Sequence, residues 1–173
     1  MKINEHNKEF IRTIILIFTV LVFTSHVYAE SNGLVNLSGV EQKIEDYHEK
    51  NKWLVVMVWA SDCLICNQEA KNYEAFYQSR KDKDIKLLGL SIDGLAGIKN
   101  ARQFIKGHNL TFPNLIGENS HVSQHYYELT GQFLAGTPAF LIFNPNAELV
   151  AAQIGAVPVS RIEKFISKTQ SKL

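Results

Sequence analysis

The chain alternates short apolar runs with stretches in which apolar residues recur every three or four positions. Trp53–Trp59 is an uninterrupted run of seven apolar residues, and Ile85–Ile92 is a second, largely apolar run. Runs of this length without polar alternation are typical of strands buried on both faces, as the central strands of a parallel sheet are. The two segments therefore predict the middle of a sheet that is covered on both sides.

Apolar residues at helical spacing predict five helices around these strands. The first passes through residues 40–47, and Ser38 is positioned to cap it. Ser61 or Asp62 can cap the second helix, which directly follows the first strand. The helices after the first are expected at about residues 63–79, 98–105, 120–129 and 162–166.

The C-terminal third contains a hairpin signal. Ala139–Phe143 is an apolar strand, residues 144–147 form a turn rich in Asn and Pro, and Leu149–Ile154 is the returning strand. Alternating strands and helices ahead of a terminal antiparallel pair are typical of an α/β domain. The fold class expected is a mixed central sheet with helices on both faces.

The N-terminal segment has a different composition. Basic residues precede the apolar run Ile14–Phe23, which is about half of the roughly 20 residues that a membrane-spanning helix needs. Val27-Tyr28-Ala29 offers a signal-peptidase site after Ala29. Residues 1–29 are therefore predicted to be a signal peptide, with an uncleaved anchor as the alternative, and residues 30–173 a single domain. On either interpretation the domain is exported.

Charge excludes one class of partner. The chain carries 18 basic and 17 acidic residues, and removing residues 1–29, with three basic and two acidic residues, leaves 15 of each. A domain without a basic stripe is not expected to bind nucleic acid. No polybasic patch for a membrane surface is evident either.

The two cysteines, Cys63 and Cys66, are three positions apart. A disulfide closing so short a loop would stabilise the fold by roughly 2 kcal/mol, against nearly 5 for a loop of about 100 residues, so chemistry explains the pair better than stability does. The pair lies where a buried strand meets a helix, and the positive end of the helix dipole stabilises a thiolate there. Cys63 is the expected nucleophile and Cys66 the resolving thiol one turn deeper.

A zinc set with His121 and His125 is disfavoured because the spacing far exceeds that of a zinc finger.

The segment from Trp53 to Glu69 resembles the active-site strand and helix of the TlpA/ResA-like branch of the thioredoxin superfamily. Further matches are Ser91-Ile92-Asp93, Phe112-Pro113, the stretch from Gly136 to Ile142 and Gly155. The resemblance covers roughly residues 35–168 and implies a thioredoxin fold. Residues 94–117 are similar to the α/β insertion that separates this branch from plain thioredoxin.

The resemblance also implies roles for individual residues. Cys63 and Cys66 match the redox pair, and Pro138 matches a cis-proline beside which Thr137 would offer backbone hydrogen bonds to a substrate strand. Glu69 matches an acidic residue that serves as a possible proton acceptor, and a solvated helix carboxylate is the alternative interpretation.

Three residues around the cysteines depart from the family pattern. Family members often have proline before the second cysteine and Trp or Pro before the first, whereas this chain has Ile65 and Asp62. With Leu64, the intervening pair is wholly apolar. A carboxylate beside Cys63 opposes thiolate formation. These residues leave the direction of electron flow open.

The resulting hypothesis is an exported, periplasmic or outer-face thiol–disulfide oxidoreductase. It would reduce protein disulfides or cysteines awaiting haem attachment and would be re-reduced by a membrane donor of the DsbD/CcdA type. No cofactor beyond the Cys63–Cys66 disulfide and no metal is expected. The alternatives are a DsbA-like thiol oxidase, for which about 144 mature residues leave little room, and a non-catalytic thioredoxin-fold binding module.

Overall fold

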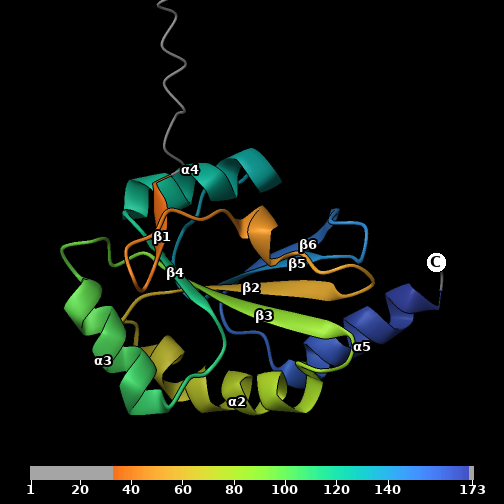
Figure 1. Cartoon of the computed structure of the whole chain (residues 1–173). Coiled ribbons are helices and arrows are strands. Elements are labelled where there is room, and N and C mark those ends of the chain that lie inside the picture. Colours follow the sequence, from red (N-terminus) through yellow and green to blue (C-terminus); the bar gives the residue numbers. More distant parts are fainter. Residues whose placement is uncertain (1–32, 172–173) are drawn as a thin grey trace, which may run out of the picture. The chain divides into compact units, whose positions relative to one another are not determined.

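A computed structural model describes residues 33–171 (Figure 1). The signal peptide expected at residues 1–29 lies outside the described residues. In chain order the elements are β1 Leu34–Asn36, the 3₁₀ helix η1 Ile44–Tyr47, β2 Trp53–Trp59, α2 Leu64–Arg80, β3 Ile85–Ser91, α3 Ile98–His108, β4 Asn114–Gly117, α4 Asn119–Thr130, β5 Ala139–Phe143, β6 Leu149–Ile154 and α5 Val159–Gln170. No helix within residues 33–171 is long and apolar enough to cross a membrane.

The strands of the described region form one mixed sheet of six strands, in the order β1-β4-β3-β2-β5-β6. β2 pairs in parallel with β3, and β3 with β4, whereas β5 runs antiparallel to β2 and to β6. β1 closes the opposite edge by antiparallel pairing with β4. The sheet has the mixed character that the sequence predicts, and β2, the strand that leads to the cysteines, lies in its middle.

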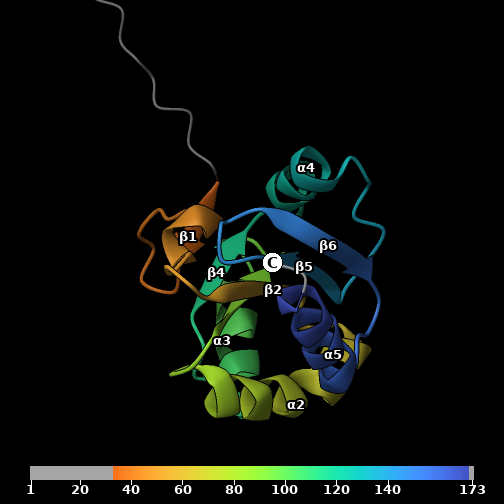
Figure 2. The same cartoon turned by 90° about the vertical axis from the view of Figure 1, so that its right-hand side faces the viewer.

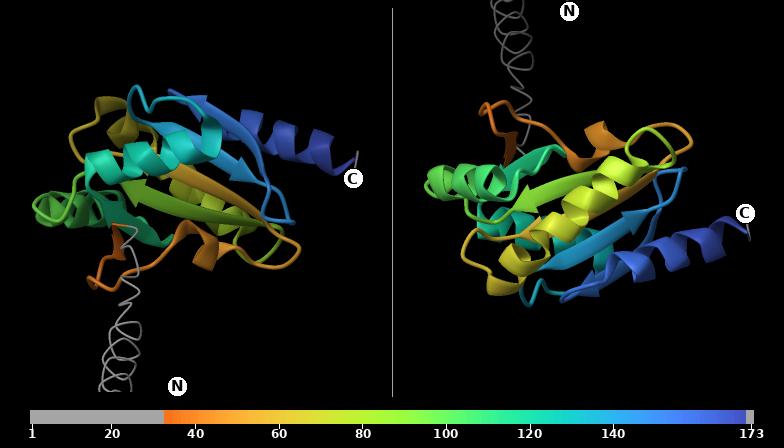
Figure 3. Two further views of the ribbon diagram at one scale, coloured as in Figure 1. Left: turned by 90° about the horizontal axis from the view of Figure 1, so that it is seen from above. Right: turned by 90° about the horizontal axis from the view of Figure 1, so that it is seen from below.

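The alternating side chains of β2 divide the core into two layers. Trp53, Val55, Met57 and Trp59 belong to the cluster beneath α2, α3 and α5, and the intervening residues 54, 56 and 58 belong to the cluster beneath α4 and η1. Figures 1 and 2 show α4 on one face of the sheet and α2, α3 and α5 on the other. The views from above and below in Figure 3 show α4 crossing one face and α2 and α5 crossing the other. This arrangement confirms the α/β fold class.

Residues 94–117 form α3 and β4, in the place where the sequence indicates an α/β insertion. β4 extends the sheet beyond β3, and α3 packs Ala101 and Phe104 into the cluster that contains Trp59 and Cys66. The insertion therefore contributes part of the core behind the cysteines.

The prediction of a helix through residues 40–47 is wrong in the length of the helix. Only the single 3₁₀ turn of η1 forms there, and Ser38 caps no helix. The Asn36 side-chain oxygen accepts hydrogen bonds from the backbone N–H groups of Ser38, at 2.9 Å, and Val40, at 3.0 Å. This local turn competes with helix formation, because the Ser38 and Val40 N–H groups bond to the Asn36 side chain, whereas in a helix they would point along the helix axis.

The strand β1 has no counterpart in the sequence prediction, and β4 was implied only by the resemblance of residues 94–117 to an α/β insertion. They are three and four residues long, which is too short for a hydrophobic period to be evident. Asn114 adds a buried polar residue to β4, and this residue interrupts the apolar pattern. Both strands are stabilised by partners that are distant in the sequence.

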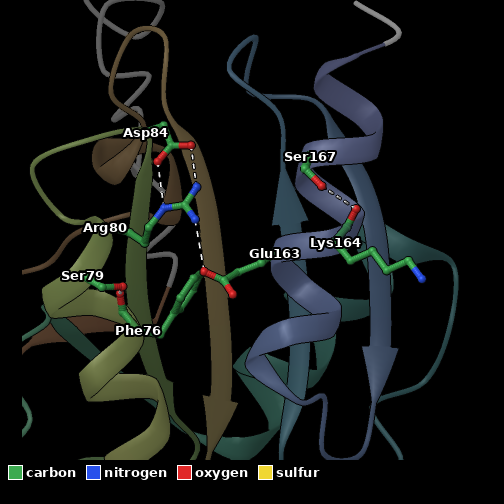
Figure 4. A network of polar contacts seen from close by, with 7 residues as sticks. All are labelled: Phe76, Ser79, Arg80, Asp84, Glu163, Lys164 and Ser167. Atoms are coloured by element: carbon green, nitrogen blue, oxygen red, sulfur yellow. Dashed lines mark hydrogen bonds and ion pairs between the residues drawn. The ribbon is translucent and has the colours of Figure 1, made fainter.

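An ion-pair network joins the end of α2 to α5 (Figure 4). The Arg80 guanidinium donates to both carboxylate oxygens of Asp84, at 3.0 and 2.7 Å, and to Glu163 at 3.1 Å. This pairing holds the pKa of Asp84 below its ordinary value, against the opposing effect of its partial burial.

Candidate redox site

The two cysteines lie at the start of α2 and form a disulfide with a Cα–Cα distance of 5.2 Å. Cys63, and not the expected Ser61 or Asp62, is the N-cap residue of the helix, and its sulfur accepts the backbone N–H of Cys66 at 3.1 Å. A sulfur that receives a free first-turn N–H at the positive end of the helix dipole lies where a thiolate would be stabilised.

The two sulfur-bearing residues differ in exposure. Cys66 is fully buried in the cluster that contains Trp59, whereas Cys63 is only partly buried. An incoming reagent therefore reaches Cys63 more readily than Cys66. The sequence prediction that Cys66 lies deeper agrees with this placement.

Hydrogen bonds hold the loop before Cys63 from two sides. The Asp93 carboxylate, just beyond β3, accepts the Ser61 backbone N–H at 3.1 Å and the Ser61 hydroxyl at 3.0 Å. On the other side, the Asn67 amide donates to the carbonyl oxygens of Ser61 and Cys63, at 3.1 and 2.9 Å. The loop is thus fixed to the sheet through Asp93 and to α2 through Asn67. Sequence reasoning did not find the role of Asn67, because nothing local distinguishes it from other helix amides.

The Thr137–Pro138 peptide bond is cis, as the resemblance implies for this position. The Thr137 carbonyl oxygen lies 3.4 Å from Cys63 Sγ, so this loop is beside the disulfide. The Pro138 carbonyl accepts the backbone N–H of Gly155 at 2.8 Å, which ties the loop to the segment after β6. The structure therefore brings Thr137 and Pro138 to the cysteines, and their role in substrate binding stays a prediction.

Glu69 lies on α2, one turn beyond Cys66, and is partly buried. Its carboxylate accepts a hydrogen bond from the Asn72 side chain at 2.9 Å. The neighbouring Tyr73 is buried, and its hydroxyl donates to the Val157 carbonyl at 2.6 Å. Burial raises the pKa of Tyr73, and the Glu69 carboxylate adds to that rise. The role of Glu69 as a proton acceptor stays a prediction.

The side chains next to Cys63 face solvent. Leu64 and Ile65 keep 70% and 40% of their surface exposed, and Asp62 is exposed as well. The residues that depart from the family pattern therefore form an exposed rim around Cys63. Water around an exposed Asp62 carboxylate weakens its effect on the neighbouring sulfur.

A stack of rings lies behind the cysteine loop. Trp59 is fully buried and stacks on Phe104 with a centroid distance of 4.3 Å, and Phe104 contacts the His108 ring edge-on at 4.6 Å. The Trp59 indole N–H donates to Asn114 at 3.1 Å. Trp59 is therefore core packing that backs the site. A pocket of about 460 Å³ opens beside the Phe104 and His108 rings, and Ser61 and Asn67 also line it.

The described part of the chain offers no candidate metal site. Across residues 33–171 no group of three or more His, Cys, Asp or Glu side chains is arranged to hold a metal ion. Cys63 and Cys66 are bonded to each other.

A cysteine pair at the start of a helix, opposite a cis-proline loop and next to the central strand of a mixed sheet, defines a thioredoxin-like dithiol protein. The chain belongs to the AhpC/TSA family, whose model matches residues 13–152. This membership and the relatives described next confirm the resemblance to the TlpA/ResA-like branch.

Two curated relatives and one solved structure illustrate the similarity. Thiol-disulfide oxidoreductase ResA of Oceanobacillus iheyensis is 25% identical over 118 residues, which cover 68% of this chain and 57% of ResA. Sporulation thiol-disulfide oxidoreductase A of Bacillus subtilis is 20% identical over 117 residues, covering 67% of each chain. The C-terminal domain of a putative thiol-disulfide oxidoreductase from Bacteroides thetaiotaomicron superposes with a TM-score of 0.63 at 22% identity, covering 81% of this chain and 91% of that one. The chain thus spans little more than half of the ResA relative.

Proposed function

We propose that this protein is a thiol–disulfide oxidoreductase that reduces disulfides in other proteins. One observation carries the thiol–disulfide exchange in this proposal: a partly exposed Cys63 and a fully buried Cys66 share a disulfide, and the Cys66 N–H points at the Cys63 sulfur. That asymmetry suits an attacking thiol and a resolving thiol. ResA and the sporulation protein are both thiol-disulfide oxidoreductases, which supports this class of activity.

The reaction would proceed in two exchanges. In the reduced protein, the Cys63 thiolate attacks one sulfur of a substrate disulfide. The substrate S–S bond breaks, and the departing sulfur takes up a proton. Cys66 then loses its proton and attacks Cys63 Sγ, which breaks the mixed disulfide and releases the second substrate thiol. Two electrons pass from the dithiol to the substrate, and the Cys63–Cys66 disulfide forms.

Three further residues have proposed roles in this cycle. Thr137 and Pro138 would bind the substrate segment that carries the disulfide, because their loop lies against Cys63 Sγ. Glu69 would accept the Cys66 proton before the second exchange. Its place one turn beyond Cys66 supports this role, and the hydrogen bond from Asn72 occupies only one of its two carboxylate oxygens.

The proposed setting is outside the cytoplasm, in the periplasm or on the outer face of the inner membrane. The basic and apolar pattern of residues 1–29 supports export. An exported reductase needs a source of electrons, because that compartment has no reducing glutathione buffer. A membrane dithiol protein of the DsbD/CcdA type would supply them. Cysteines awaiting haem attachment are a proposed substrate group.

Reduction of insulin with dithiothreitol as electron donor tests the activity. We expect turnover by the native protein and none by Cys63→Ser. A Cys66→Ser variant should accumulate mixed disulfides through Cys63, which identify physiological partners. Absence of turnover, with no difference between the native protein and Cys63→Ser, would contradict the proposal.

The reduction potential separates a reductase from a DsbA-like oxidase. A reductase is expected near the thioredoxin value of about −270 mV, whereas an oxidase would lie near about −120 mV. Equilibration with glutathione and dithiothreitol buffers, followed by alkylation of free thiols, measures this value.

A further inference from the structure

Asn67 is the hydrogen-bond link between the cysteine loop and the insertion helix α3. Both hydrogens of its amide nitrogen are committed, one to the Ser61 carbonyl at 3.1 Å and one to the Cys63 carbonyl at 2.9 Å. The amide orientation is therefore fixed, because a flipped amide would place its oxygen against two carbonyl oxygens. The Asn67 oxygen faces His108 Nε2 at 3.0 Å.

This arrangement determines which nitrogen of the His108 ring carries the proton. Since the Asn67 oxygen can only accept, His108 Nε2 must carry the proton and donate it. The second ring nitrogen, Nδ1, is buried and has no hydrogen-bond partner among the described residues. Within residues 33–171, the His108 ring therefore makes one hydrogen bond, the one with Asn67. Its position is otherwise set by edge-on packing against Phe104, which stacks on Trp59.

We propose that His108 is a positioning residue for the redox pair, acting through Asn67 on the loop that carries Cys63. The inference rests on the proposed function and adds to it a link from α3 in the insertion to the attacking cysteine. His108 anchors the oxygen end of the Asn67 amide, and the nitrogen end of the same amide holds the carbonyl groups of Ser61 and Cys63. The loop is then fixed between Asn67 on one side and Asp93 on the other.

The link matters more in the reduced protein than in the oxidised one. In the oxidised protein, the S–S bond itself ties Cys63 to the helix. When that bond is broken, the backbone contacts of the loop keep Cys63 Sγ over the Cys66 N–H. A thiolate that keeps this donor is stabilised, and one that loses it is less so. Weakening the link should therefore destabilise the reduced thiolate, raise the pKa of Cys63 and make the dithiol a stronger reductant.

The test uses the reduced full chain and compares His108→Leu, which removes the donor, with His108→Gln, whose amide nitrogen can occupy the place of Nε2. Gln103→Ala is the matched control, because Gln103 is on the same helix and lines the same pocket. Cys63 reactivity is read as the rate of alkylation by iodoacetamide across pH and as thiolate absorbance at 240 nm. Neither readout involves a protein substrate, so the result is independent of whether the protein reduces insulin.

We expect His108→Leu to lower the Cys63 alkylation rate at pH 7 by about threefold or more and to move its pH profile to higher pH, since the rate follows the thiolate fraction. His108→Gln should restore most of the rate, and Gln103→Ala should leave it unchanged. Asn67→Leu should lower the rate at least as much as His108→Leu, and the double variant should differ little from Asn67→Leu alone. A His108→Leu profile equal to that of the native protein would overturn the proposal. So would an equal shift in Gln103→Ala or a failure of His108→Gln to restore the rate.

Discussion

Among single residues, Cys63 and Cys66 differ chiefly in access, and this difference can be measured without any substrate. Cys66 has no exposed surface, whereas Cys63 is partly exposed beside the exposed Leu64. After reduction, we expect iodoacetamide to modify Cys63 at least about tenfold faster than Cys66, because alkylation requires an accessible thiolate. Peptide mass spectrometry over a time course measures both rates. In denaturant the two rates should converge, and equal rates in the native protein would contradict the assignment of Cys63 as the attacking thiol.

The sequence predicted the reactive residues of the site better than the residues that hold them. Cys63 and Cys66 are only three positions apart in the chain, and Thr137-Pro138 is a local motif, so both could be found from sequence alone. Asn67 and His108 meet across 41 positions, and Ser61 and Asp93 across 32. No periodicity reports such pairs. Ser61 was expected to cap the helix, but its hydroxyl donates a hydrogen bond to Asp93, because Cys63 occupies the cap position.

Among secondary-structure elements, the close approach of β3 to its neighbours depends on Gly89. A side chain there would overlap the Asn114 amide, which accepts the Trp59 indole N–H, and would lie 2.9 Å from that indole nitrogen. We expect Gly89→Ala to lower the free energy of unfolding by about 1–3 kcal/mol, the usual effect of overpacking a core or displacing a buried hydrogen bond. Urea denaturation measures the change.

Gly107 provides the control for that substitution. It lies in α3, and a Cβ added there meets nothing within 4 Å. Gly107→Ala should therefore be neutral or stabilise the protein by up to about 1 kcal/mol through helix propensity. Equal losses of stability in the two variants would contradict the packing argument.

The contact between α2 and the loop before β3 should make stability depend on pH. The Arg80 pair lowers the pKa of Asp84 in the folded protein, so the carboxylate stabilises the fold above its unfolded pKa of about 4, and the contribution is lost as pH falls through the lower folded value. Asp84→Asn should cost about 1 kcal/mol near pH 7, and the difference from the native protein should shrink as the pH falls below about 4. Urea denaturation at several pH values tests this, with Asp82→Asn, exposed in the same turn, as the control. A cost that stays constant down to pH 2 would contradict it.

Elements with a strong hydrophobic pattern were predicted within one or two residues, as β2, β5 and β6 show. The missed strand β1 owes its structure to a distant partner, and the overextended helix was cut short by a local turn. β1 exists through its pairing with β4, and η1 contributes only Ile44 to the core because the Asn36 turn takes up the preceding residues. Short edge elements of this kind carry little information in their own sequence.

For the molecule as a whole, the redox state and the stability of the fold are linked. The two redox states and the folded and unfolded states form a thermodynamic cycle. The oxidised protein is more stable to unfolding than the reduced protein by the free energy by which the folded state favours the disulfide more than the unfolded chain does. A reductase gives its electrons up readily, so its folded state favours the disulfide. An oxidase of the DsbA type is the reverse, because its reduced form is stabilised.

The reductase proposal therefore predicts that the oxidised protein is the more stable form. We expect its free energy of unfolding to exceed that of the reduced protein by about 2 kcal/mol, the scale on which closing so short a loop restricts the unfolded chain. Thermal and urea denaturation with and without dithiothreitol measure the difference. A variant with both cysteines replaced by serine should not respond to dithiothreitol, which controls for effects of the reductant itself. A higher melting temperature in the reduced form would reverse the proposed direction of electron flow while leaving Cys63 as the attacking residue, because the site is the same for both directions and only the stability of its reduced state differs.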